Sequence, residues 1–346
     1  MSYQNIGTPI FYVDHLLWLK SLGELEYQAE PGWSGVSGSD MVSLNPSNYH
    51  KMFNKDVTPS GNYSYIEYPQ APKIGESIKN YVAVLGHNCH TAGASIHFVN
   101  LDGGQTDAYP LVNGSYGIPE YDGFSMYTNI DFGGHKFIRI HGLYQEAQAD
   151  NHIGCYSHGN YYQMPHSPDL SLTLTRDYSG IKTIETKGGV SLSNRFYHKP
   201  PNWGTLGAWE LRGGYMSDDP QYEDSFRSKL SRSGRRIWDL SFSYLDSLDV
   251  MENVGALYWA EFNAPSGVAL STGDDNFDRT LLHHDSFYNQ VVHKTNGFQL
   301  PFIFLPDSSN TNPDQFAICK VDQNSFQMKQ VANGVYNVKL KIREIW

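Results

Sequence analysis

The clearest pattern along the chain is an alternation of apolar and polar residues, which is typical of β-strands that bury one face. Residues 236–245 alternate over a long stretch and place Trp238 and Tyr244 on the same face. Residues 335–346 alternate in the same way. We predict two long strands here and, with them, a β-sheet core. The predicted core residues are Trp238, Phe302, Phe304, Tyr336 and Leu340.

Shorter segments carry related signals. Residues 81–85 form a continuous apolar run that ends at Gly86, as expected for a buried strand. Residues 10–23 predict a strand that leads into a short helix, with Gly23 ending the helix. Further strands are predicted at residues 94–99, 136–141, 170–175, 181–186, 190–193, 300–305, 315–321 and 325–328.

One segment in the second half of the chain favours a helix. Within residues 285–296, the apolar residues Phe287, Val291 and Val292 lie at helical spacing. Gly297 follows and is a typical stop signal. We predict a single short helix in this half of the chain.

The distribution of these elements predicts a mainly β protein. Long stretches rich in Gly, Ser, Pro and Tyr separate the strands and are expected to form loops. The predicted division has three parts: an assembly arm with loops at residues 1–74, a jelly-roll-like β-sandwich at residues 75–150, and a second β-rich domain with one short helix and long loops at residues 151–346.

Composition narrows the class of protein further. Charged residues make up 18% of the 346 residues, aromatic residues 14%, and the net charge is -11. The aromatic content argues against a disordered chain, and the low charge argues against a coiled coil. The acidic balance argues against nucleic-acid partners, because phosphate binding requires Lys and Arg. No apolar run approaches about 18 residues, so no membrane span is predicted.

The chain carries three cysteines, which are far apart in the sequence. An odd and sparse set does not predict a disulfide framework. The first residues show neither the basic region nor the cleavage site of a secretory signal. We therefore expect a protein that is made and kept in a reducing compartment.

Two short clusters contain the residue types that bind zinc. The first contains His152, Cys155 and His158, and the second contains His87, Cys89 and His90. Because a structural zinc site needs four ligands, neither cluster supplies a complete set. We therefore predict no metal site and keep His152, Cys155 and His158 as weak candidates. The alternative is that the histidines bond to the backbone while the cysteines fill apolar space.

Asp274, Asn276 and Asp278 have the spacing of a calcium-binding loop. An EF-hand loop also needs Gly at its sixth position and Glu at its twelfth, and this chain has Arg279 and Asp285 there. We therefore predict a solvated acidic turn.

No motif indicates an enzyme. The chain lacks the G-x-S-x-G motif of serine hydrolases, the phosphate-binding P-loop and the dinucleotide fingerprint. Neighbouring acidic residues that would suit a glycosidase occur by chance among 36 Asp and Glu. We therefore predict no catalytic residue and no cofactor.

Three segments resemble virion structural proteins of tailed bacteriophages. Residues 81–96 contain LGHN followed by GA, and they are similar to a strand–turn–strand of sandwich domains in tail and baseplate proteins. Residues 232–245 and 287–306, followed by the strand that ends in KIREIW, are similar to minor tail and distal tail proteins. The resemblance covers roughly half of the chain and involves patterns of strands and turns.

The resemblance implies a structural component of the virion in the tail tip, distal tail or baseplate region, assembled in the cytoplasm of a bacterial host. Its partners would be copies of itself in a ring and other tail proteins. His87 and Asn88 would hold a turn at a strand end through side-chain hydrogen bonds to the backbone. Loops at residues 31–72 and 103–134 would carry subunit contacts, because aromatic residues are enriched at protein interfaces.

A glycan-binding, lectin-like module for attachment to the host surface is the alternative, since aromatic side chains also stack on sugars. It predicts exposed Tyr or Trp beside Asn, Asp and His in a groove lined by loops. An enzyme ranks below both, and a metal-dependent enzyme would need His152, Cys155 and His158 to converge.

Overall fold

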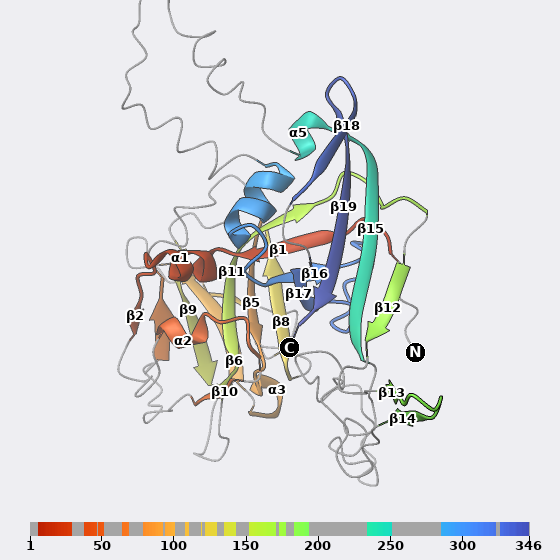
Figure 1. The fold of residues 1–346 in the computed structure, drawn as a ribbon. Helices are drawn as coiled ribbons and strands as arrows, with labels where there is room; N and C mark the ends of the chain where they lie inside the picture. The colour runs from red at the N-terminus through yellow and green to blue at the C-terminus, as the bar shows by residue number, and fades with distance from the viewer. Residues whose placement is uncertain are drawn as a thin grey trace, which may run out of the picture.

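The structure, a computed structural model, is mainly β, as the sequence predicts (Figure 1). It describes residues 6–29, 38–46, 48–51, 64–68, 79–92, 94–100, 108–110, 119, 122–129, 135–142, 152–170, 173–177, 183–193, 234–250, 285–322 and 326–345. Within these ranges the strands form a ten-stranded sheet, a five-stranded sheet and two separate strand pairs. Their pairings are antiparallel. The predicted calcium-like turn at Asp274, Asn276 and Asp278 lies outside the described residues.

The ten-stranded sheet joins distant parts of the chain. Its order is β12 (Thr173–Asp177), β15 (Arg235–Asp246), β19 (Val335–Glu344), β17 (Ala317–Val321), β16 (Phe302–Leu305), β1 (Ile10–Asp14), β11 (Cys155–Gln163), β5 (Asn80–Leu85) and β8 (Phe124–Thr128), with β18 (Met328–Ala332) paired to β19. All three predicted segments therefore contribute strands to one sheet. Because β1 lies between β11 and β16, residues 10–14 belong to the core and not to an assembly arm.

The five-stranded sheet has the order β2 (Gln28–Ala29), β4 (Ser64–Glu67), β9 (His135–Gly142), β6 (Ala94–Asn100) and β7 (Ala108–Pro110). The separate pairs are β3 (His50–Lys51) with β10 (His152–Ile153), and β13 (Thr183–Glu185) with β14 (Ser191–Ser193). The strands within residues 75–150 are thus divided between two sheets, and their jelly-roll arrangement stays a prediction.

The described helices are short. They are α1 (His15–Leu22), α2 (Gly38–Met41), α3 (Cys89–Ala92) and α5 (Ser247–Val250). As predicted, β1 leads into α1: the side chain of Asp14 accepts a hydrogen bond from the Leu17 N–H at 3.0 Å, and Gly23 ends the helix with φ 79°. None of the helices in the described ranges is long and apolar enough to cross a membrane.

The helix predicted at residues 285–296 has an unusual form. It consists of a π-helix, η3 (Tyr288–Val292), followed by a 3-10 turn, η4 (His293–Thr295). The apolar spacing predicted a helical segment but not the wider winding. A π-helix forms hydrogen bonds between residues five apart, whereas an α-helix forms them between residues four apart. Such turns are frequently found at functional sites. Here the segment packs against β1 and β11.

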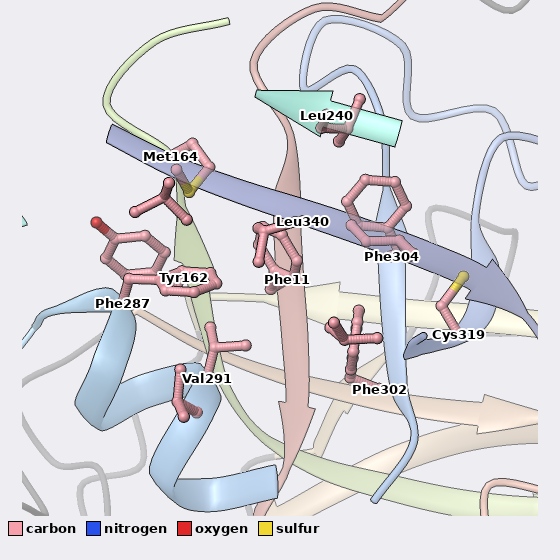
Figure 2. Packing of buried hydrophobic residues seen from close by; sticks show 14 of the residues in the cluster. Phe11, Tyr162, Met164, Leu240, Phe287, Val291, Phe302, Phe304, Cys319 and Leu340 are labelled. Atoms are coloured by element: carbon pink, nitrogen blue, oxygen red, sulfur yellow. The ribbon is translucent and has the colours of Figure 1, made fainter. Parts of the chain in front are cut away.

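The main core fills one side of a strongly curled sheet. Trp238 on β15 meets Phe304 on β16 edge-on at 5.1 Å between ring centroids, although β19 and β17 lie between these strands in the sheet. A flat sheet would keep the two rings about three strand spacings apart, roughly 14 Å. Figure 2 shows the helical segment contributing Phe287 and Val291 on one side of this core and β19 contributing Leu340 on the other.

Four of the five predicted core residues are confirmed: Trp238, Phe302, Phe304 and Leu340 are buried. Tyr336, the fifth, is half-buried and packs against the margin of the main core.

The long strand β15 departs from the predicted alternation near its end. A bulge between Phe242 and Leu245 shifts the register with β19. Leu245 therefore points into the core, while Tyr244 adopts φ 64° and is 80% exposed. The prediction that Tyr244 shares the buried face of Trp238 is wrong, because one bulge reverses the phase of every later side chain.

The opposite face of the sheet is also buried. A second cluster contains Tyr12, Tyr81, Leu85 and Ile303, and two of these, Tyr12 and Ile303, alternate along β1 and β16 with residues of the main core. All six residues of β5 are buried, which confirms the strand predicted from the apolar run at residues 81–85. With both faces covered, the centre of the sheet is a rigid unit.

Candidate interaction surface

The three weak metal candidates do not come together. Cys155 and His158 lie three positions apart on β11, so the alternation of side chains places them on opposite faces of the sheet. Cys155 packs in the second cluster with Leu85, and burial raises the pKa of its thiol. His152 stacks on Tyr49, with ring centroids 4.6 Å apart. Among the described residues, no three metal-ligating side chains gather in one place.

His87 and Asn88 make the hydrogen bonds expected of a turn. Nδ1 of His87 accepts from the Cys89 N–H at 3.3 Å, which leaves Nε2 to donate to Oγ of Ser125 on β8 at 2.9 Å. Burial lowers the pKa of His87 to about 3, so its ring stays neutral at pH 7. Oδ1 of Asn88 accepts from the His152 N–H at 2.8 Å. The two side chains tie the end of β5 to β8 and β10.

A buried polar cluster, which sequence reasoning missed, joins the π-helical segment to the sheet. Nζ of Lys294 donates to Oε1 of Gln290 at 2.8 Å, and Nδ2 of Asn160 on β11 donates to the same oxygen at 3.3 Å. All three side chains are buried. The four-residue spacing of Gln290 and Lys294 is visible in the sequence, but a lysine at a helical position usually faces solvent.

Titratable groups surround this cluster. Burial lowers the pKa of Lys294 to about 7 and raises that of Asp14 to about 7. Burial, followed by the charges of Lys294 and His158, holds the pKa of His15 well below its usual value. Neither ring nitrogen of His15 has a hydrogen-bond partner among the described residues. Because the hydrogen bonds of Gln290 join the helical segment to β11, we assign the cluster to holding the helical segment in place.

The hairpin β13–β14 presents an apolar face to solvent. Residues 183–192 are all exposed. Ile184 and Leu192 lie directly opposite each other and so share one face, with 54% and 57% exposed. Val190 lies two residues before Leu192 and is 58% exposed. We call Ile184, Val190 and Leu192 the hairpin face. A two-stranded hairpin alone is marginally stable in water, and exposed apolar side chains on one face favour a covering partner.

A second exposed apolar surface lies at the end of β15. Tyr244 stands at the bulge of β15, and its N–H donates to Oδ1 of Asn337 on β19 at 3.1 Å. Val331, at the bulge where β18 pairs with β19, is 43% exposed. Tyr336 of β19 pairs with Leu245 of β15 on one side and with Gln330 of β18 on the other. Tyr244 is the residue before Leu245, and Val331 is the residue after Gln330. We call Tyr244 and Val331 the sheet tip.

The loops predicted to carry subunit contacts lie largely outside the described residues. Five of their large apolar side chains are buried within this chain: Met41, Val42, Leu44, Tyr68 and Phe124. Tyr68 stacks on Tyr156 of β11 at 5.4 Å, so it belongs to the interior and not to an interface. Two others are exposed, Tyr49 by 55% and Tyr127 by 39%.

Among the described residues, the hairpin face and the sheet tip contain exposed apolar side chains that sequence reasoning did not identify. The strands were predictable from alternation, but no local signal told which alternating face would stay uncovered. Comparison of the chain with protein-family models, with curated proteins and with solved structures found no match.

Proposed function

We propose that this chain is a structural subunit of a tailed-bacteriophage virion, located in the tail tip, distal tail or baseplate region. Copies of the chain would form a ring or platform with one another and with other tail proteins. The role is scaffolding and not catalysis. The observation that carries the proposal is the hairpin face, an exposed apolar surface displayed beside a sheet that is buried on both faces.

The physical argument has two parts. The curled ten-stranded sheet resists deformation, because close-packed apolar side chains lie on both of its faces. Each apolar side chain of the hairpin face is 54–58% exposed, so complete coverage by a neighbour would contribute about 0.8–1.7 kcal/mol per side chain. A rigid body that displays such a surface is suited to assembly, whereas a monomer would keep the surface in water.

Mass spectrometry of virions purified from the culture that produces this chain tests the proposal. We expect the chain to copurify with the particles, and we expect antibodies against it to label the tail end in negative-stain images. The number of copies of this chain in each particle, measured relative to the other tail proteins, should equal the number of subunits in one or more closed rings. Absence of the chain from purified particles would overturn the proposal.

A glycan-binding module is the second candidate, and one contact favours it. Tyr49 is 55% exposed and stacks on His152, so an aromatic ring faces solvent beside an imidazole. A glycan array probed with the full chain, and with Tyr49→Ala as control, tests this function. Binding that the substitution abolishes would support a lectin, and no binding on the array would remove it.

A further inference from the structure

We propose that the helical segment, here residues 287–298, is an acid-sensitive latch that covers the main core at neutral pH and leaves it more often as the pH falls. The proposal rests on basic side chains that are buried together where this segment packs, and on strain in its backbone. It goes beyond the proposed function and does not depend on it, because it concerns a movement within one chain.

Basic side chains from three elements gather at the place where the helical segment packs. Lys294 belongs to η4, His15 begins α1, and His158 lies on β11. All three are buried, with at most 3% of each residue exposed. The charges of Lys294 and His158 both lower the pKa of His15, which shows that the three groups are neighbours. Protons taken up here would place like charges together in the interior, where charges are costly.

Further titratable groups lie around this site. Asp285, exposed at the start of the helical segment, raises the pKa of Lys294, but burial has the larger and opposite effect. Burial and the charge of Lys294 lower the pKa of His293. Asp14 follows Tyr12 by two residues on β1, so its carboxyl lies on the opposite face of the sheet, with the second cluster. The site itself therefore combines three basic groups with one exposed acid at its margin and His293 beside it.

The backbone of the helical segment is strained. Five of its residues wind as a π-helix, and Asn296, Gly297 and Phe298 then follow with φ of 51°, 68° and 72°. Gly adopts a positive φ freely, whereas for a bulky residue such as Phe it is costly. Phe298 is nevertheless buried in the main core. Packing, and not local preference, therefore holds the segment in this conformation, so a change in packing free energy is enough to release it.

The helical segment covers aromatic side chains of the main core (Figure 2). Phe287 meets Phe11 of β1 edge-on at 5.3 Å between ring centroids, and it meets Tyr162 of β11 at 5.7 Å. Val291 is fully buried in the same cluster. Release would bring the apolar side chains of β1 and β11 into contact with water. The released state is therefore rare at neutral pH, and the basic groups set how rare it is.

Protons favour the released state through two of these groups. Lys294 has a pKa of about 7 when packed and its usual value of 10.5 in water. Burial, followed by the neighbouring charges, holds the pKa of packed His15 well below its usual 6.5. We call the ratio of released to packed molecules the opening constant. Between pH 8 and 5.5 each group should raise it about tenfold, because the released state binds the proton more tightly.

Asp14 has the opposite sign and separates release from complete unfolding. Burial raises the pKa of its carboxyl to about 7, above its usual 3.8, so its protonation stabilises the folded chain as the pH falls from 7 towards 4. Because Asp14 stays buried in the sheet when the helical segment leaves, its carboxyl opposes acid unfolding of the sheet without opposing release. Mild acid should therefore open the segment before it opens the sheet.

Hydrogen–deuterium exchange of the full chain, measured by mass spectrometry at pH 8 and 5.5 and corrected for the intrinsic pH dependence of amide exchange, is the primary test. We expect the opening constant of residues 287–298 to be about a hundredfold higher at pH 5.5. Amides of β5, which is buried along its whole length, are the internal reference and should change much less. An opening constant of the segment that is equal at both pH values would overturn the proposal.

Two variants test the assigned groups separately. His15→Phe and Lys294→Met each remove one titratable group from the site, so each should reduce the hundredfold change to about tenfold. The matched control is His90→Gln on α3, whose ring bonds to the carbonyl group of Pro119, and it should keep the full change. A full hundredfold change in both site variants would overturn the assignment of the latch to these groups.

Circular dichroism at pH 5.5 distinguishes release from unfolding. We expect the β-sheet signal of wild type to be retained while exchange of the helical segment increases. Loss of that signal, with β5 exchanging as fast as the segment, would overturn the latch, because the whole sheet would then have opened. If His15→Phe does not fold, Lys294→Met and the wild-type comparison still decide the outcome.

Discussion

Leu340 on β19 and Leu192 on β14 belong to strands with the same alternating chemistry, yet they have opposite surroundings. Leu340 is buried, because β19 is paired with β15 and β17 and its apolar face packs in the main core. Leu192 is 57% exposed, and within the described residues β14 pairs only with β13. Alternation therefore tells which side chains share a face, but it does not tell whether that face is covered.

The comparison extends to charged residues. Arg236 and Glu344 form a buried ion pair at 3.0 Å, and Arg236 also donates to the carbonyl oxygens of Asp314, Gln315 and Phe316. Lys341 and Asp322 form a pair of the same type at the surface, 3.4 Å apart. The buried pair connects β15, β19 and the segment before β17, whereas water can replace the surface pair.

The largest expected effect comes from the curled core. Trp238→Ala should lower the free energy of unfolding by about 3–5 kcal/mol, because it removes a buried ring that contacts Phe304 and leaves a cavity. Urea denaturation at low protein concentration measures the change. Tyr244→Ala, on the same strand but at an exposed position, should change stability by less than about 0.5 kcal/mol. Equal losses in the two variants would contradict the assigned bulge.

Breaking the buried ion pair ranks next. Glu344→Gln should cost about 3 kcal/mol, because it leaves the buried guanidinium of Arg236 without its counter-charge. Asp322→Asn is the matched surface control and should cost between about 0 and 1 kcal/mol. The same denaturation series compares them. A loss for Glu344→Gln no larger than for its control would show that the carbonyl oxygens alone satisfy Arg236.

A pH-dependent effect, smaller for each pH unit than the losses above, is expected at the polar cluster. The buried Lys294 has a pKa of about 7, well below its usual value of 10.5, so folding requires it to lose a proton between these two pH values. The stability of wild type relative to Lys294→Met should therefore rise as pH increases from about 7 to about 10.5. The slope should not exceed about 1.4 kcal/mol per pH unit. A stability difference that stays constant over this window would contradict the neutral, buried state of Lys294.

The smallest effect on stability is expected at the hairpin face. Leu192→Ser should change the free energy of unfolding of the monomer by less than about 0.5 kcal/mol, since the side chain already contacts water. Thermal denaturation of dilute protein tests this. Leu340→Ser, at a buried position of β19, is the contrasting variant and should be strongly destabilising. A large loss for Leu192→Ser would mean that the hairpin face packs within its own chain.

Local sequence signals account for much of the fold. Gly23 after an apolar stretch predicts the C-terminal end of α1, because a left-handed terminal residue needs no distant partner. The cap that Asp14 forms at the other end is also local, but the sequence analysis did not identify it. The alternation at residues 236–245 predicts β15 in the same way. The bulge at Tyr244 was not predictable, because the pairing of β15 with β19 decides it.

The features that bear on function depended on contacts between distant segments. The histidine–cysteine spacing on β11 suggested ligands, but strand alternation separates Cys155 from His158. The sequence indicated two strands around a Gly-Gly turn, but it did not reveal that Ile184 and Leu192 would remain exposed. The turn residues His87 and Asn88 were easier to predict, since their partners are backbone groups and a side chain at the ends of neighbouring strands.

The sequence by itself determined a mainly β chain, the positions of its long strands and most of its core residues, because these follow from periodicity and local capping. Only the tertiary structure decided that β1 lies at the centre of a sheet built from all three predicted segments, and that Lys294 of the helical segment is buried. It also decided which apolar faces stay in water. Burial depends on which distant strands come to lie beside a given one, and the pattern within a strand is the same whether or not its face is covered.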